Sequence, residues 1–235
     1  MTIAITGASG QLGQRALQHL VTLCGQDSLV ALARDPAKLE NTGIASRRFD
    51  YKAVETLVPA LDGVDTLVLI SSSDFQDRVG QHANVIDAAR TAGVGRIVYT
   101  SILKADRSPL LIANDHRETE ALIAASGVPA TIVRNSWYTE NWTATLAGSI
   151  AAGALVGSAG DARFTPATRQ DYAEALAVVA ASWDHAGQVY ELAGDEAFSL
   201  SELADEVSRQ IGRPLAYQDL PPADYGAIQI GRAHV

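Results

Sequence analysis

The chain has 235 residues, of which 47% are hydrophobic and 19% are charged, a composition that excludes a disordered protein. Acidic residues outnumber basic ones by 27 to 18, and the net charge of −9 argues against a nucleic-acid partner, because phosphate contacts need clustered Lys and Arg. The single cysteine, Cys24, excludes an internal disulfide and is compatible with a reducing compartment such as the cytoplasm.

No targeting segment or membrane partner is expected. The N-terminus, MTIAITGASG, has neither a basic start nor a long apolar stretch. The longest uncharged run, residues 141–160, contains several glycines and polar side chains, whereas a membrane helix needs about 20 predominantly apolar residues. We predict a helix followed by a glycine-rich loop in this run.

Short apolar runs alternate with helical patterns over the first 134 residues. The predicted strands are residues 3–6, 29–33, 46–50, 66–70, 96–101 and 130–134, and helical patterns cover residues 12–24, 77–92 and 115–126. In the first of these helices, Leu12, Ala16, Leu20 and Leu23 fall on one face. Runs that are apolar throughout are typical of strands covered on both faces, so the pattern predicts an α/β fold with a parallel sheet.

Glycines mark the expected ends of three helices. Gly93, Gly127 and Gly212 stand where a left-handed residue closes a helix, and Pro129 and Pro214 prevent two of the helices from continuing. Such helix–glycine–strand repeats indicate βαβ units with right-handed crossovers.

The pattern changes after residue 134. Helices are predicted to begin near Thr168, with Asp171 three residues on, and near Ser199, with Glu202 three residues on, and residues 188–194 suggest one more strand. We expect residues 1–134 to form a binding core and residues 135–235 to complete that core and form a substrate lobe.

The strongest motif is TGASGQLG at residues 6–13, directly between a predicted strand and a helix. Gly7 would permit a tight turn, Gly10 would let the backbone approach a pyrophosphate at the helix N-terminus, and Gly13 would allow close helix–sheet packing. This context predicts dinucleotide binding; a purely structural turn is the alternative.

The residue that ends the second strand bears on the choice of cofactor. Arg34 lies about 20 residues after the glycines, where NAD-binding chains usually place an acid. A guanidinium there could bind the 2′-phosphate of NADP, unless Arg34 is simply a solvated surface charge. The adjacent Asp35 precedes Pro36 and is better interpreted as a helix cap.

Polar residues follow the next two strands as well. Asp50 and Tyr51 could form an adenine wall, or Asp50 could simply cap the following helix. Ser71–Ser73 stand at the carboxyl end of a central strand, where open α/β sheets bind ligands, although an ordinary polar loop is the alternative.

The sixth strand ends in VRNSWYTENW, a mixture of aromatic and polar groups that suits a nicotinamide ring and a flat substrate. An aromatic lid on the second lobe is the alternative. Arg169 could reach the cofactor or remain on the surface, and His82 is expected to be a satisfied interior histidine. No spacing of His, Cys, Asp and Glu predicts a metal site.

Together, TGASGQLG, ALARDP, LVLISSSD, IVYTSILKAD and VRNSWYTEN resemble the NmrA-like group of atypical short-chain dehydrogenases, and within it the bacterial NADPH-dependent quinone reductases. The resemblance implies a Rossmann-type parallel sheet with helices on both faces, a small discontinuous second lobe, and a quinone-like acceptor between them. It also implies NADPH contacts at Gly7, Ala8, Ser9, Gly10, Gln11, Leu12, Arg34, Ser73, Asn135, Ser136, Trp137, Tyr138, Thr139, Glu140 and Arg169.

The chain departs from the wider dehydrogenase family at the catalytic Tyr–Lys pair. His116 and Glu120 occupy that helical spacing, and Tyr99 is followed four residues later by Leu103. Losing this proton relay is compatible with quinone reduction, because reduced quinone oxygens can take protons from water. Asn135 and Tyr138 are the predicted orienting residues, and His116 is a candidate proton donor.

We therefore predict an NADPH-dependent quinone reductase. A reductase of triphenylmethane or azo dyes and an NADP(H)-binding redox sensor without turnover are the alternatives. The sequence leaves the physiological acceptor open, and a homo-oligomer is compatible with it.

The C-terminal residues raise a separate expectation. The family pattern suggests that the chain should continue, yet residues 230–235 read IGRAHV. One frame of a widely used short-read sequencing adapter encodes these six residues. We expect Ile230–Val235 to be non-native and poorly packed, with a natural short tail as the alternative.

Overall fold

The computed structural model describes the backbone of residues 1–233 and the side chains of residues 1–227. The chain divides into two compact units. The first consists of Met1–Ser136 and Arg169–Leu192, and the second of Trp137–Thr168 and Ala193–Val235.

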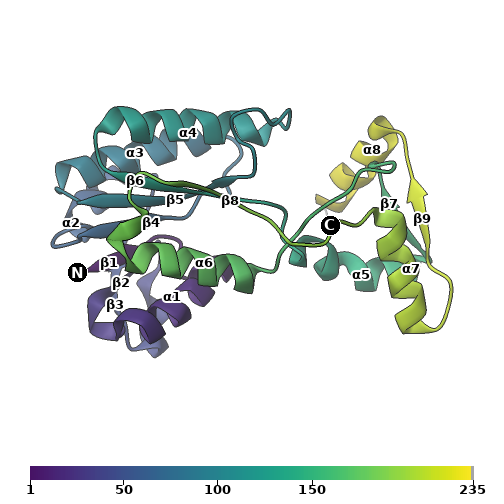
Figure 1. Cartoon of the computed structure of the whole chain (residues 1–235), viewed down its shortest axis with the longest axis horizontal. Coiled ribbons are helices and arrows are strands. Elements are labelled where there is room, and N and C mark those ends of the chain that lie inside the picture. The colour runs from purple at the N-terminus through teal and green to yellow at the C-terminus, as the bar shows by residue number, and fades with distance from the viewer. Residues whose placement is uncertain (234–235) are drawn as a thin grey trace. The chain divides into compact units, whose positions relative to one another are not determined.

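The first unit is built on a seven-stranded parallel sheet with the order β3-β2-β1-β4-β5-β6-β8 (Figure 1). Its strands are β1 (Ile3–Ile5), β2 (Leu29–Ala33), β3 (Ala45–Arg48), β4 (Thr66–Leu69), β5 (Arg96–Ile102), β6 (Ala130–Asn135) and β8 (Val189–Leu192). The strand order reverses between β1 and β4, both of which pair in parallel with their neighbours. Ligands of such sheets bind beyond the carboxyl ends of the strands at this reversal.

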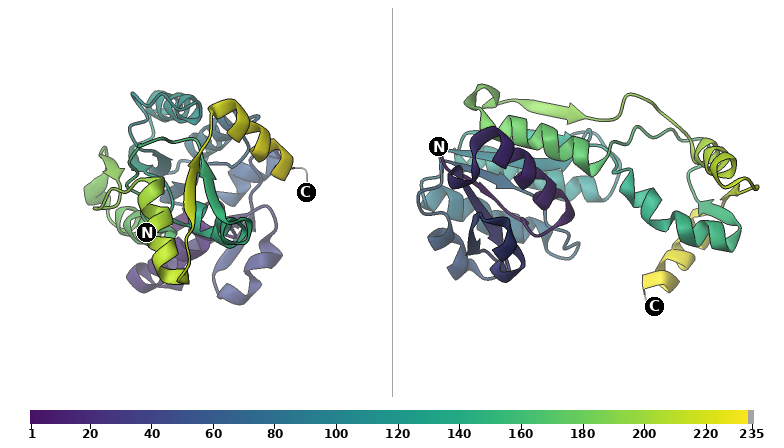
Figure 2. Two further views of the ribbon diagram at one scale, coloured as in Figure 1. Left: turned by 90° about the vertical axis from the view of Figure 1, so that its right-hand side faces the viewer. Right: turned by 90° about the horizontal axis from the view of Figure 1, so that it is seen from below.

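Helices cover both faces of this sheet, as the apolar runs predicted. One face carries α1 (Gln11–Cys24) and α6 (Arg169–Ala181), which lie side by side (Figure 2). The other face carries α3 (Arg78–Thr91) and α4 (Ile112–Ser126), and the short α2 (Leu57–Ala60) precedes β4. The helix α1 buries Leu12, Ala16 and Leu20 but leaves Leu23 52% exposed, so the predicted apolar face was wrong at its last turn.

One apolar core of the first unit lies between the sheet and the pair α3–α4. Leu67 and Tyr99 from the strands pack there with Val85 from α3 and Ile123 from α4. Gly93 and Gly127 close these two helices with φ of 72° and 75°, which confirms the predicted left-handed ends.

The second unit contains α5 (Glu140–Ala152), β7 (Ala154–Gly157), α7 (Leu200–Ile211), β9 (Ala216–Asp219) and α8 (Pro222–Ala233). The strands β7 and β9 pair in parallel, so the loop predicted after α5 is wrong where β7 forms. This strand forms because Leu155 packs with Leu200 and Leu215, which are distant in the sequence.

The predicted start of α7 is confirmed as a capping box. The Ser199 hydroxyl accepts the backbone N–H of Glu202, and the Glu202 carboxylate accepts the backbone N–H of Ser199. The expectation of poor packing for residues 230–235 lies outside the residues whose side chains are described. None of the helices described is both long and apolar enough to cross a membrane.

Candidate functional site

The glycine motif forms a tight turn between β1 and α1. Gly7 has a φ of +59°, which favours glycine, and its carbonyl accepts the N–H of Gly10 at 2.8 Å. A Cβ on Gly10 would lie 3.1 Å from the Gly7 carbonyl oxygen, and a Cβ on Gly13 only 2.3 Å from it. A side chain at position 13 would therefore collide with the backbone of the glycine turn. The sequence predicted a different reason for Gly13, namely close packing of α1 on the sheet.

The N-terminus of α1 is open to a ligand. Gly10 is its N-cap with extended backbone, no side chain caps it, and no acidic residue stands in its first turn. Gly10 and Gln11 are exposed, whereas Ala8 is buried and its N–H donates to Leu32 of β2. An uncapped helix N-terminus with accessible N–H groups is a ready site for an anion such as a pyrophosphate.

Arg34 follows β2 directly and is exposed. The neighbouring Asp35 accepts the N–H of Ala37 at 3.2 Å and caps the 3-10 helix Pro36–Thr42. The sequence interpretation of Asp35 as a cap is therefore confirmed. One carboxylate oxygen of Asp35 is thus used within its own turn, directly after Arg34.

The turn after β4, residues 71–73, is held by hydrogen bonds to residues of β5 and α3. The Ser71 N–H donates to Thr100 of β5 at 2.9 Å, and the Ser72 N–H donates to Nε2 of His82 at 2.9 Å. The Ser72 carbonyl accepts Arg78 Nε at 2.7 Å. Ser73 remains exposed.

These segments line one pocket of about 570 Å³ at the carboxyl edge of the sheet. Its lining comprises Gly7, Ser9, Gly10, Ala33, Arg34, residues 49–52, residues 70–74 and Gln81. The structure thus brings together the glycine turn, Arg34 and Ser73 in the first unit, at the point where the strand order reverses. Ala8 and Leu12 are buried in or beside the same turn.

The residues after β3 contribute to the pocket in a way that the sequence did not specify. The Asp50 carboxylate accepts the Lys52 N–H and closes a turn, while the next helical turn begins at Val54, so the helix-cap alternative for Asp50 is wrong. The Tyr51 hydroxyl donates to the Ile70 carbonyl at 2.8 Å. Tyr51 therefore braces the loops after β3 and β4.

Sequence reasoning missed three polar lining residues, Lys52, Asp74 and Gln81. Lys52 and Asp74 form an ion pair of 2.7 Å, and Gln81 Nε2 donates to Asp74 at 2.8 Å. The position of Lys52 and Asp74 just after two predicted strands was the available signal.

The pair that replaces Tyr–Lys is engaged inside the protein. His116 is 5% exposed, its Nδ1 lies 2.8 Å from the Tyr99 hydroxyl, and burial lowers the pKa of His116 to about 4. Glu120 accepts the Ser101 hydroxyl at 2.6 Å and forms an ion pair of 2.6 Å with Arg134. Neither side chain is arranged as a Tyr–Lys relay.

The other predicted contacts are distributed over both units. Asn135 ends β6, is 4% exposed, and its carbonyl accepts the Leu103 N–H at 2.8 Å, with Ser136 directly after it. Arg169 begins α6. Trp137, Tyr138, Thr139 and Glu140 belong to the second unit, where Tyr138 bridges to Ala167 and Trp137 packs 6.1 Å from Trp142.

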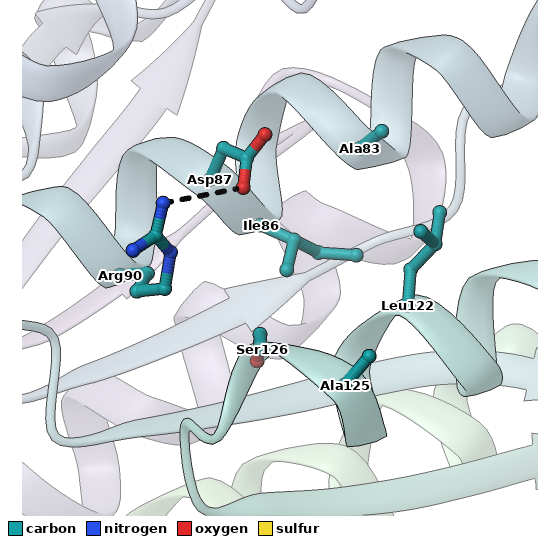
Figure 3. A pocket seen from close by; sticks show the side chains of 7 residues that line it. All are labelled: Ala83, Ile86, Asp87, Arg90, Leu122, Ala125 and Ser126. Carbon is teal, nitrogen blue, oxygen red and sulfur yellow. Dashed lines mark ion pairs between the residues drawn. The ribbon is translucent and has the colours of Figure 1, made fainter.

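A second hollow, of about 340 Å³, lies on the outer surface between α3 and α4 (Figure 3). Its lining residues are Ala83, Ile86, Asp87, Arg90, Leu122, Ala125 and Ser126. The only ion pair among these seven is Asp87–Arg90, within one helix. The pocket at the carboxyl edge of the sheet, which contains the glycine turn and Arg34, is therefore the better candidate for a cofactor site.

Comparison with known proteins identifies a matching family and several similar proteins. The sequence profile of a family described as NAD(P)H-binding matches residues 7–182. Quinone oxidoreductase 2 of Escherichia coli (strain K12) is 47% identical over 228 residues, which cover 96% of this chain and 80% of that protein.

Solved structures extend the similarity to three dimensions. The crystal structure of the NADPH-dependent quinone oxidoreductase of Escherichia coli with NADPH has a TM-score of 0.94 at 46% identity, covering 97% of this chain and 81% of that one. Triphenylmethane reductase of Citrobacter sp. with NADP(H) has a TM-score of 0.93 at 32% identity, covering 99% of this chain and 84% of that one.

Proposed function

Because this chain belongs to the family of NAD(P)H-binding proteins, we propose that it is an NADPH-dependent reductase that transfers hydride to a quinone. The observation that carries the proposal is one pocket lined by the glycine turn, Arg34 and Ser73, in a chain 47% identical to a quinone oxidoreductase.

The residues of the pocket fit NADPH. Gly10 places no side chain at the exposed N-terminus of α1, where the backbone N–H groups of Gln11 and Leu12 in the first helical turn would hold the pyrophosphate. The Arg34 guanidinium would bind the 2′-phosphate, and Ser73 would contact the cofactor from the loop after β4. When bound, the cofactor supplies the hydride, and the chain's own contribution is to bind and orient it.

The environment of His116 supports an acceptor that needs no acid from the protein. Its lowered pKa leaves His116 neutral at physiological pH, and the Tyr99 hydroxyl engages its Nδ1. A quinone accepts hydride directly, and its reduced oxygens can be protonated by water. Asn135 and Tyr138 remain our predicted orienting residues, and Ser136, Trp137, Thr139, Glu140 and Arg169 our predicted cofactor contacts.

Two alternatives have their own support. Similarity to triphenylmethane reductase favours dye reduction. The internal engagement of His116 and Glu120 is also compatible with a redox sensor that binds NADP(H) without turnover. We also infer that the protein acts in the cytoplasm, where Cys24 would stay reduced. A homo-oligomer remains a prediction, which sedimentation analysis would test.

The test follows NADPH absorbance in the full chain with no acceptor, with a small benzoquinone, and with a triphenylmethane dye. We expect oxidation that depends on the quinone and exceeds oxidation with the dye. Faster turnover with the dye would show that dyes, and not quinones, are the substrate class. Tight NADPH binding without turnover of either acceptor would support the sensor.

A further inference from the structure

His82 is a buried side chain that the proposed chemistry does not use, yet it contacts the cofactor pocket through a single hydrogen bond. It belongs to α3 and is 0% exposed. Its Nε2 receives the backbone N–H of Ser72 at 2.9 Å, in the middle of the turn that lines the pocket. A backbone N–H can only donate, so Nε2 must be the unprotonated nitrogen of the ring.

The opposite side of the ring fixes this tautomer. Nδ1 of His82 lies 2.9 Å from the Thr119 hydroxyl oxygen on α4. That hydroxyl donates its own proton to the Asp115 carbonyl at 2.8 Å, so its oxygen accepts the Nδ1 proton. The His82 ring therefore lies between α4 and the turn after β4, with Nδ1 as the donor to Thr119 and Nε2 as the acceptor from Ser72.

The ring is also kept neutral. Burial lowers the pKa of His82 to about 3, and the nearby His116 and Arg78 act in the same direction. A charged ring could not accept the Ser72 N–H. At physiological pH the acceptor is therefore always present.

The remaining polar groups of Ser72 also bond inward. Its hydroxyl donates to Gln81 Oε1 at 2.8 Å and accepts the Asp74 N–H at 3.1 Å. Ser72 thus serves as the fixed point of the turn, and Ser73 beside it is exposed toward the pocket. Losing the His82 acceptor would leave the Ser72 N–H unpaired and free the turn to rearrange.

We propose that His82 is a positioning residue for the cofactor, acting through the Ser72 N–H to hold the turn 71–73 in its binding conformation. The inference rests on the cofactor site proposed above. It assigns His82 no contact with NADPH and no proton transfer.

Two substitutions separate the hydrogen bonds from the packing of the ring. His82→Phe keeps an aromatic ring between Tyr51 and Tyr99, whose centroids lie 6.3 and 5.4 Å from that of His82, but removes both hydrogen bonds. His82→Gln removes the ring but offers an acceptor and a donor separated by one carbon, like the ring nitrogens. NADPH affinity is measured by fluorescence titration of the full chain.

We expect His82→Phe to weaken NADPH binding by about tenfold and His82→Gln to stay within about threefold of wild type. In turnover with a quinone, His82→Phe should raise the KM for NADPH more than it lowers kcat. His185→Phe is the matched control. His185 precedes β8, and its Nδ1 hydrogen-bonds the hydroxyl of Tyr190 in that strand, so this histidine lies near the amino end of β8 and not in the cofactor pocket. It should leave NADPH affinity unchanged.

Equal weakening by His82→Phe and His82→Gln would overturn the proposal, as would His82→Phe binding NADPH like wild type. If His82→Phe does not fold, ¹⁵N NMR of histidines in the wild-type chain decides. A neutral Nδ1–H tautomer and a protected Ser72 amide support the role, and an Nε2–H or charged ring contradicts it. A wild-type chain that binds no NADPH would overturn both this inference and the cofactor site.

Discussion

At the scale of single residues, we propose that Arg34 determines the choice of cofactor. It lines the pocket, it is exposed, and its acidic neighbour Asp35 is occupied as a cap. Its position after β2 and its residue type were enough to select Arg34 as a candidate from the sequence, and the structure places it in the pocket lining. The sequence did not identify Lys52 and Asp74, because their pairing joins two loops that only the folded sheet brings together.

Arg34→Ala should weaken NADPH binding about tenfold to a hundredfold, since a hydrogen bond to a charged group contributes roughly 1.5–3 kcal/mol. NADH binding should hardly change, because NADH lacks the 2′-phosphate. Titration with each cofactor measures the difference. Arg90→Ala, at an exposed arginine on α3 that lines the other hollow, is the control. An equal loss for both cofactors in Arg34→Ala would refute the assignment.

The structure gives His116 an internal role. Its ring is nearly buried and pairs with Tyr99, a contact that no local sequence pattern predicts because the partners lie on α4 and β5. His116 is therefore expected to matter more for the packing of α4 than for proton transfer.

His116→Asn, which retains an acceptor for the Tyr99 hydroxyl, should keep kcat for quinone reduction within about tenfold of wild type. General acid–base catalysis contributes about 10²–10⁴-fold, so a loss of that size would make His116 the proton donor. Steady-state rates at saturating NADPH decide between the two results.

At the scale of secondary-structure elements, Arg96 stabilises the end of α6. This arginine begins β5, is fully buried, and donates to the carbonyls of Val179, Ala180 and Ser182 at 2.6–3.2 Å. Its guanidinium also lies 5.1 Å from the Trp183 ring. A cation at a helix C-terminus is favourable, and these contacts offset the burial of the charge.

Arg96→Met should lower the free energy of unfolding by about 2–4 kcal/mol, because it leaves several carbonyls without their charged donor. Arg90→Met, which removes only the exposed 3.8 Å pair with Asp87, should change it by less than about 1 kcal/mol. Urea unfolding curves measure both. Similar small effects for the two variants would show that Arg96 does not anchor α6.

The sequence predicted most elements of the first unit, because continuous apolar runs and closing glycines are local features. The predicted strand over residues 29–33 coincides with β2, and Gly127 ends α4 as expected. The strand β7 was missed because its four residues gain their stability from β9, more than 50 residues away. The role of Arg96 was missed because a charged residue at the start of a strand does not indicate which helix end it will contact in the fold.

At the scale of the whole molecule, the chain crosses between its two units several times. Local patterns predicted the strand that became β8, which returns to pair with β6. They could not assign Trp137–Glu140 to the second unit, because that depends on pairing between segments far apart in the sequence. The predicted contacts of these residues with NADPH therefore stay predictions.

Stability should fall on mild acidification. His82 and His116 have folded pKa values of about 3 and about 4, below the usual 6.5, so the unfolded chain takes up protons first as the pH falls. Their contribution is fully present above about pH 6.5 and is lost progressively as the pH falls, down to about pH 4 for His116 and about pH 3 for His82. Each accounts for about 2 kcal/mol between about pH 6.5 and pH 5.

Urea unfolding across this range checks the prediction, because most carboxylates titrate at lower pH. His116→Asn should show a shallower decline than the wild-type chain. A free energy of unfolding that stays constant between about pH 6.5 and pH 5 would mean that these histidines are not held neutral.

The central claim is that the chain passes hydride from NADPH to a quinone. Its most direct test is the stoichiometry of anaerobic turnover, with NADPH and quinone followed together and NADH as the competing donor. We predict one quinone reduced for each NADPH consumed, no NADPH consumption without quinone, and a kcat/KM for NADPH at least about tenfold above that for NADH, as loss of the charged contact to the 2′-phosphate implies. NADPH consumption that does not depend on quinone, or equal use of NADH, would contradict the account.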